Sequence, residues 1–111
     1  MTDNSGSTRI FQLQGRLDSA AAPARERELQ TLVDCGAVNL VIDLTEVSFL
    51  SSAGLRVLLM GAKACRAAGG QAVLVGPQES ALQVLQMSGF DRLLKVFADR
   101  ESALASLPPT P

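Results

Sequence analysis

The sequence contains no histidine, tryptophan or tyrosine, and it has only two cysteines. Without histidine, the chain cannot form a histidine-based catalytic triad or a histidine-ligated metal site, and it lacks the usual general base near neutral pH. Cys35 and Cys65 match no zinc-binding spacing. We expect each to lie in a helix as a small apolar residue, which fits a reducing compartment; a disulfide is the less favoured alternative. Because the four phenylalanines are the only aromatic residues, a platform for stacking nucleic-acid bases is not expected.

Strong charge of one sign and long apolar runs are also missing. Ten basic and eleven acidic residues give a formal net charge of −1, which offers no electrostatic case for binding nucleic acid, a function that calls for a basic face or stripe. No apolar run reaches the length of a membrane span, and the N-terminal MTDNSGSTR is unlike a signal peptide. With 47% hydrophobic residues, 111 residues suffice for one folded domain. We therefore expect a cytoplasmic domain without direct membrane contact, as a monomer or weak dimer.

The hydrophobic pattern alternates between strand and helix periodicity four times. This order requires parallel neighbouring strands joined by crossover helices. We expect one α/β domain with a mixed, mostly parallel sheet of about four to five strands and about four helices, packed mainly on one face. It should occupy residues 9–107, with flexible ends at 1–8 and 108–111. The expected strands are about residues 9–14, 39–44, 72–75 and 93–97, and the expected helices about residues 20–35, 52–68, 78–88 and 100–107.

The most informative stretch is residues 41–59, VIDLTEVSFLSSAGLRVLL. A strand passes through an apolar connection, residues 45–50, into a helix that begins at Ser51 and Ser52. Serines at a helix start can cap it, or can carry a phosphate where free amides and the helix dipole favour negative charge. Helical projection places Ser52, Arg56, Met60 and Lys63 on one side, away from an apolar stripe of Leu55, Leu58 and Leu59. An exposed methionine between two cations is typical of a partner-binding surface, although a capping serine and a solvated helix face explain the pattern too.

Evidence for catalysis is sparse. The carboxylates Asp18, Asp43 and Glu46 could gather at one end of the sheet, but a role in solvating and capping loops is favoured over acid–base work. Ser52 as a nucleophile has no histidine partner and no GxSxG context, and Lys63 lies away from the helix start. No glycine-rich nucleotide loop is present. We expect no enzyme, no cofactor and no metal.

Residues 43–55, DLTEVSFLSSAGL, resemble the signature of the STAS family of anti-sigma factor antagonists. Three further segments are similar to the family: residues 15–18 to its first loop, Gly69-Gly70 to the break before the next strand, and residues 87–90 to its late helix end. The resemblance implies that Ser52 is phosphorylated by a serine kinase that is also the anti-sigma factor. The unphosphorylated protein would bind this kinase and free the sigma factor, and a cognate phosphatase would restore binding. It also implies a partner-binding set: Asp18, Ser51, Ala53, Gly54, Leu55, Arg56 and Met60.

One departure from the family pattern concerns kinase recognition. The best-known antagonists have aspartate directly before the acceptor, where this chain has Ser51, which is itself a competing acceptor. Some family members are not phosphorylation switches. The alternative function is therefore a constitutive STAS adaptor subunit in a membrane lipid-transport or stress-signalling complex.

Overall fold

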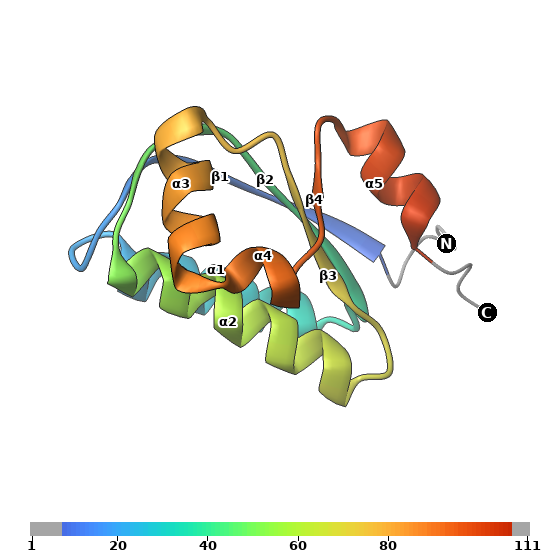
Figure 1. Cartoon of the computed structure of the whole chain (residues 1–111). Helices are drawn as coiled ribbons and strands as arrows, with labels where there is room; N and C mark the ends of the chain where they lie inside the picture. Colours follow the sequence, from blue (N-terminus) through green and yellow to red (C-terminus); the bar gives the residue numbers. More distant parts are fainter. Residues whose placement is uncertain (1–7, 108–111) are drawn as a thin grey trace.

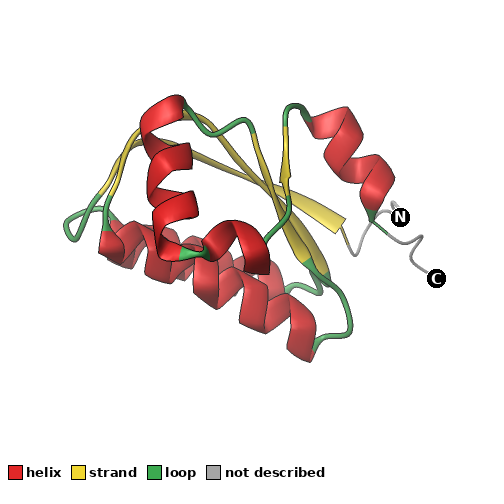
Figure 2. Ribbon diagram, in the orientation of Figure 1, coloured by secondary structure: helices red, strands yellow, loops and turns green. Residues whose placement is uncertain are grey.

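The computed structural model describes residues 8–107, which form one α/β domain (Figure 1, Figure 2). Its four described strands lie in the order β1-β2-β3-β4, and every neighbouring pair is parallel. The predicted fold class is confirmed, with a parallel rather than mixed sheet and five helices in this range. The elements are β1 (Thr8–Leu17), α1 (Ala22–Asp34), β2 (Asn39–Leu50), α2 (Ser52–Ala67), β3 (Ala72–Val75), α3 (Glu79–Ser88), α4 (Phe90–Leu93), β4 (Val96–Phe97) and α5 (Arg100–Ser106).

Helices α1 to α4 cover one face of the sheet and α5 covers part of the other (Figure 1). Alternation along β2 divides the core, because successive side chains of a strand point to opposite faces. Leu40, Ile42 and Leu44 belong to the larger cluster with α1 to α4, whereas Val41 packs with the α5 residue Ala103. Helices therefore lie mainly on one face, as predicted. No helix of residues 8–107 has the length and hydrophobicity to cross a membrane.

The first two strands are longer than predicted. β1 continues past residue 14 to Leu17 and β2 past residue 44 to Leu50, so the apolar connection expected at residues 45–50 is part of a strand. Two register shifts accommodate the extra pairing, one of them beside Gly15, whose φ is +74°. The extension is stabilised by burial of Leu17 and Leu50. It carries β1 and β2 beyond β3, which stops opposite Asp43.

Other predicted boundaries were wrong near the ends of elements. The last strand, expected at residues 93–97, is only Val96–Phe97, because Gly89 ends α3 at φ +79° and the chain then forms the short helix α4. Cys35 is exposed at the end of α1 rather than within the helix, whereas Cys65 is buried in α2. Thr8, expected in the flexible N-terminus, begins β1. The rest of the predicted flexible ends lies outside the described residues.

A buried carboxylate fastens α5 to the sheet. Asp43 accepts hydrogen bonds from Arg100 Nε at 2.6 Å and from the amide and hydroxyl of Thr45 at 2.9 and 2.7 Å. Burial alone would raise the pKa of Asp43, but these hydrogen bonds and the Arg100 charge hold the pKa below its usual value. The register places Asp43 opposite Gln12, roughly 20 Å along β2 from its C-terminal end at about 3.3 Å per residue. Asp43 and Asp18 therefore do not gather at one end of the sheet.

Candidate functional site

The candidate site lies where β1 and β2 end and α2 begins, at the carboxyl edge of the sheet (Figure 1). Ligand and partner sites of parallel sheets commonly lie at this edge. Leu17 and Leu50 are partners in the last register position of β1 and β2. The Ser51 amide then donates to the Leu17 carbonyl oxygen at 3.0 Å, so the start of α2 is held against the end of β1.

Ser51 has a structural role as the N-cap of α2. Its backbone is extended at φ −96° and ψ 177°, and its hydroxyl oxygen accepts a hydrogen bond from the Gly54 amide at 3.3 Å. The same hydroxyl donates to the Leu17 carbonyl oxygen at 2.7 Å. Ser51 is also half-buried. Because both bonds occupy this hydroxyl, Ser51 is poorly placed to serve as a competing phosphate acceptor or as a partner contact.

Ser52 is the first residue of α2, and its side chain is exposed. Its hydroxyl makes no hydrogen bond to any other residue of the described range 8–107. The first amides of a helix have no partner within the helix, and the Ser51 cap satisfies only that of Gly54. Free donors and the positive end of the helix dipole therefore surround an accessible hydroxyl, which is a suitable position for a phosphate.

Gly54, predicted to contact a partner, is instead a buried packing residue. A Cβ atom at this position would lie 2.7 Å from both the Leu17 carbonyl oxygen and Leu50 Cδ1. Such contacts are closer than real Cβ atoms make, so the approach of α2 to β1 requires glycine. The signature residue Gly54 therefore sets the position of Ser52 without facing solvent.

The remaining predicted contacts on α2 divide by exposure. Arg56 is exposed, one helical turn after Ser52. Ala53, Leu55 and Met60 are half-buried and pack against the core, so the prediction of an exposed methionine was wrong. Within the apolar stripe expected on this helix, only Leu58 is fully buried, while Leu55 and Leu59 are partly exposed.

Asp18 contributes a fixed negative charge beside the start of α2. Its Oδ1 accepts from the amides of Ala21 at 3.1 Å and Ala20 at 3.2 Å, and its Oδ2 lies 3.5 Å from Arg16 Nε. The hydrogen bond from Ala21, with the smaller effects of Arg16 and Ala20, holds the pKa of Asp18 below its usual value despite partial desolvation. The carboxylate is thus ionised and oriented, with a third of the side chain exposed.

Two exposed residues at this edge were not predicted. Arg16 and Phe49 are opposite each other in the β1–β2 register, and the guanidinium carbon lies 4.3 Å from the centre of the phenyl ring. Phe49 is 40% exposed, so its ring adds an apolar contact surface to this edge. The sequence pattern could not reveal this pair, since it assigned Arg16 to a loop and Phe49 to an apolar connection.

Three comparisons place this geometry among known proteins. A family model described as the STAS domain matches residues 1–103. BtrV of Bordetella bronchiseptica, provisionally named an anti-sigma factor antagonist, is 40% identical over 97 residues, covering 87% of this chain and 84% of BtrV.

Solved structures agree with the fold. An anti-sigma factor antagonist from Mycobacterium paratuberculosis superposes with a TM-score of 0.83 at 24% identity, covering 96% of this chain and 89% of that one. SpoIIAA in its unphosphorylated form superposes with a TM-score of 0.79 at 22% identity, covering 93% and 90%. The phosphorylated form of the Bacillus cell fate determinant SpoIIAA gives a TM-score of 0.72 at 22% identity, covering 94% of each chain.

Proposed function

The chain belongs to the STAS domain family, and from this premise we propose that it is an anti-sigma factor antagonist controlled by phosphorylation of Ser52. In this proposal the unphosphorylated protein binds an anti-sigma factor that is also a serine kinase, and so frees a sigma factor. Phosphate on Ser52 breaks the complex, and a phosphatase restores it. The observation that carries the proposal is the contrast at the start of α2, where Ser52 is exposed and Ser51 is fully engaged.

The chemistry of the helix start supports a phosphate at Ser52. A phosphoserine carries about −1.5 to −2 charges near pH 7, and the free amides of the first helical turn can donate to it. Arg56 lies one turn away on the same side of α2, at the i+4 spacing that favours opposite charges. The modification would therefore leave α2 folded while changing the charge of its exposed start.

The partner surface follows from what is exposed around Ser52. Asp18, Arg16, Phe49 and Arg56 present one anion, two cations and an apolar ring at or next to this edge. An added dianion would be desolvated in a complex that covers Ser52, and a charge that the partner surface does not match costs several kcal/mol at an interface. This explains why one phosphate would be enough to release a partner.

Binding of the purified serine-kinase anti-sigma factor from the same host tests the proposal. We expect Ser52→Asp to weaken binding by about 10- to 100-fold, which corresponds to about 1.4 to 2.8 kcal/mol of binding free energy. Ser52→Ala should bind like the unaltered protein but accept no phosphate when kinase and ATP are added, as measured by intact mass and fragment mapping.

Ser80→Asp is the matched control, since Ser80 is also exposed in the first turn of a helix, α3, away from the proposed interface. It should leave binding unchanged. Equal binding by Ser52→Asp and the unaltered protein would refute the switch. A stable partner complex with no phosphate on Ser52 under any growth condition would instead support the constitutive adaptor.

A further inference from the structure

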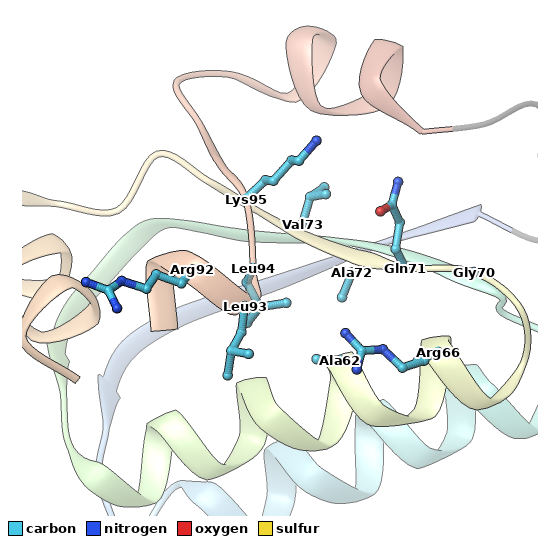
Figure 3. Close-up of a pocket in the computed structure, with 10 residues that line it drawn as sticks. All are labelled: Ala62, Arg66, Gly70, Gln71, Ala72, Val73, Arg92, Leu93, Leu94 and Lys95. Atoms are coloured by element: carbon cyan, nitrogen blue, oxygen red, sulfur yellow. The ribbon is translucent and has the colours of Figure 1, made fainter. Parts of the chain in front are cut away.

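A second hollowed surface lies toward the other end of α2 from Ser52. Two adjoining hollows, of about 150 and 200 Å³, share Ala62, Arg66 and Leu93 as lining residues. Figure 3 shows the first of them, between the C-terminal half of α2 and the segment leading from α4 into β4, with the beginning of β3 beside it. We call the two hollows together the basic groove. Besides Ala62, its lining includes Leu59, Lys63, Arg66, Arg92, Leu93 and Lys95.

The groove exists because β4 is short. Pairing between β3 and β4 begins at Leu74 and Val96, so the preceding residues of β3 have no neighbouring strand in the sheet on that side. The chain that would have continued β4 forms the helical turn α4 instead, which places Leu93 beside α2. Leu93 is left 54% exposed, although it lines both hollows. Exposed apolar surface that is rimmed by polar residues is typical of a protein-interaction site.

The rim of the groove is strongly basic. Arg66, Arg92 and Lys95 line the first hollow, and Lys63 joins Arg66 at the second. Within residues 8–107, none of the four forms an ion pair, and no acidic residue lines either hollow. The whole chain has a net charge of −1, so this concentration of cations is a local property. Complementary charge on a partner would steer its association with this surface.

The arrangement of these side chains favours an extended occupant over a small ion. In Figure 3 the Arg66 guanidinium lies beside Ala62, whereas Arg92 and Lys95 extend outward in different directions. Cations that diverge around an apolar centre suit a chain segment that carries several separate anions. Leu59, Ala62 and Leu93 offer apolar contact between them. Nucleic acid is disfavoured because no aromatic residue lines the groove on which a base could stack.

We propose that the basic groove binds an acidic segment of a protein partner, with an apolar side chain against Leu93 and carboxylates on Arg66, Arg92 and Lys95. Ser52 and Arg66 are both on α2, roughly 21 Å apart at about 1.5 Å per residue. A partner segment in the groove would therefore leave Ser52 uncovered. The proposal does not depend on the phosphorylation switch, and it gives the domain a second interaction surface that phosphate on Ser52 leaves unchanged.

The probe is a short synthetic peptide of glutamate and leucine, titrated into the isotope-labelled protein and followed by amide NMR shifts and by fluorescence anisotropy. We expect the largest shifts at residues 59–66 and 92–95. Affinity should fall about two- to fivefold for each of Arg66→Glu and Lys95→Glu, and by more for the double variant, as exposed ion pairs allow. Leu93→Ser should weaken binding as well, and 1 M salt, where the Debye length is about 3 Å, should largely abolish it.

Matched controls separate this surface from general electrostatic attraction. Arg27→Glu makes the same charge reversal at an exposed position on α1 outside the groove. This variant should bind the peptide with nearly the affinity of the unaltered protein. Ser52→Asp should also retain binding. A peptide with lysine in place of glutamate should prefer the double glutamate variant over the unaltered protein. Unfolding curves check that every variant is folded.

Equal loss of affinity in Arg27→Glu and Arg66→Glu would overturn the proposal, as would shifts centred on the Ser52 end of α2. Tighter binding of a single-stranded oligonucleotide than of the acidic peptide, lost in the same variants, would overturn it in favour of nucleic acid. Failure of the Ser52 switch would not affect either result.

Discussion

Replacing Ser51 by alanine removes one hydroxyl that makes two hydrogen bonds at the junction of β1 and α2. The bond from the Gly54 amide is an N-cap, for which loss to alanine typically costs about 1 kcal/mol. The bond to the Leu17 carbonyl oxygen contributes about another 1 kcal/mol. That carbonyl still accepts from the Ser51 amide in the variant, so it is not left unsatisfied. We expect Ser51→Ala to lower the free energy of unfolding by about 2 kcal/mol.

Ser52→Ala provides the comparison, because it changes the neighbouring residue in the same way. Its hydroxyl is exposed and has no hydrogen-bond partner within residues 8–107, so the cost should stay within about 0.5 kcal/mol. Urea unfolding followed by far-UV circular dichroism distinguishes the two. With a slope of about 2 kcal/mol per molar, the Ser51→Ala midpoint should fall by about 1 M, and the Ser52→Ala midpoint should stay near that of the unaltered protein.

A third variant tests the assigned cause. Ser51→Thr keeps a hydroxyl that can both cap α2 and donate to β1, so it should retain most of the stability lost in Ser51→Ala. Equal midpoints for Ser51→Ala and Ser52→Ala would refute the assignment of Ser51 as the structural serine. A larger loss for Ser52→Ala would reverse the assignment and undermine the proposed acceptor.

Three further predictions follow from contacts elsewhere in the domain. Gly54→Ala should destabilise the protein by about 1–3 kcal/mol or more, because the new Cβ would meet backbone and side-chain atoms at 2.7 Å. Urea unfolding measures this loss. A change in unfolding free energy below about 0.5 kcal/mol would contradict the close approach of α2 to β1. Arg100→Gln should cost about 1–3 kcal/mol at pH 7, since it leaves the buried Asp43 carboxylate without its cation, while the partial exposure of Arg100 limits the loss. The pKa of Asp43 is lowered in the folded protein. The ionised carboxylate therefore stabilises the fold above its unfolded pKa of about 3.9, and this stabilisation is lost as pH falls through the folded pKa. The difference in unfolding free energy between Arg100→Gln and the unaltered protein should shrink below about pH 4. An Arg100→Gln cost that stayed constant from pH 7 to about pH 2 would show that the ion pair is not its source. Burial raises the pKa of the Cys65 thiol to about 11. A thiol reagent at pH 8 should therefore modify only the exposed Cys35 until the protein unfolds. Fast labelling of both thiols in the native protein would contradict this.

The local sequence pattern correctly predicted the bounds of those elements that are fixed by interactions between neighbouring residues. Gly89 ends α3 and Asp99 caps α5 through the Ser102 amide, in agreement with helices predicted to end near residue 88 and to begin near residue 100. The strand predicted at residues 72–75 was also confirmed, as β3. Predictions of element boundaries were wrong where contacts between distant parts of the chain determine those boundaries. β1 and β2 extend to Leu17 and Leu50 because each provides the other's pairing and because α2 packs over both.

The candidate site shows the same division. The signature in the sequence identified two adjacent serines at a helix start, and it could not distinguish the free serine from the one already bonded. The hydroxyl of Ser51 is occupied by a carbonyl from a residue far earlier in the chain, a contact that appears only when β1 lies beside β2. The exposed Arg16 and Phe49 pair likewise depends on the register of those strands.

By itself, the sequence determined the order of strands and helices, the α/β class, the family resemblance and the position of Ser52, because periodicity, caps and the signature are written in neighbouring residues. Only the tertiary structure decided that Ser51 caps while Ser52 is exposed, that Asp43 pairs with Arg100, and that a basic groove forms beside Leu93. The reason is physical: these features depend on hydrogen bonds, ion pairs and close packing between segments far apart in the chain, and such contacts leave no periodic trace in the sequence.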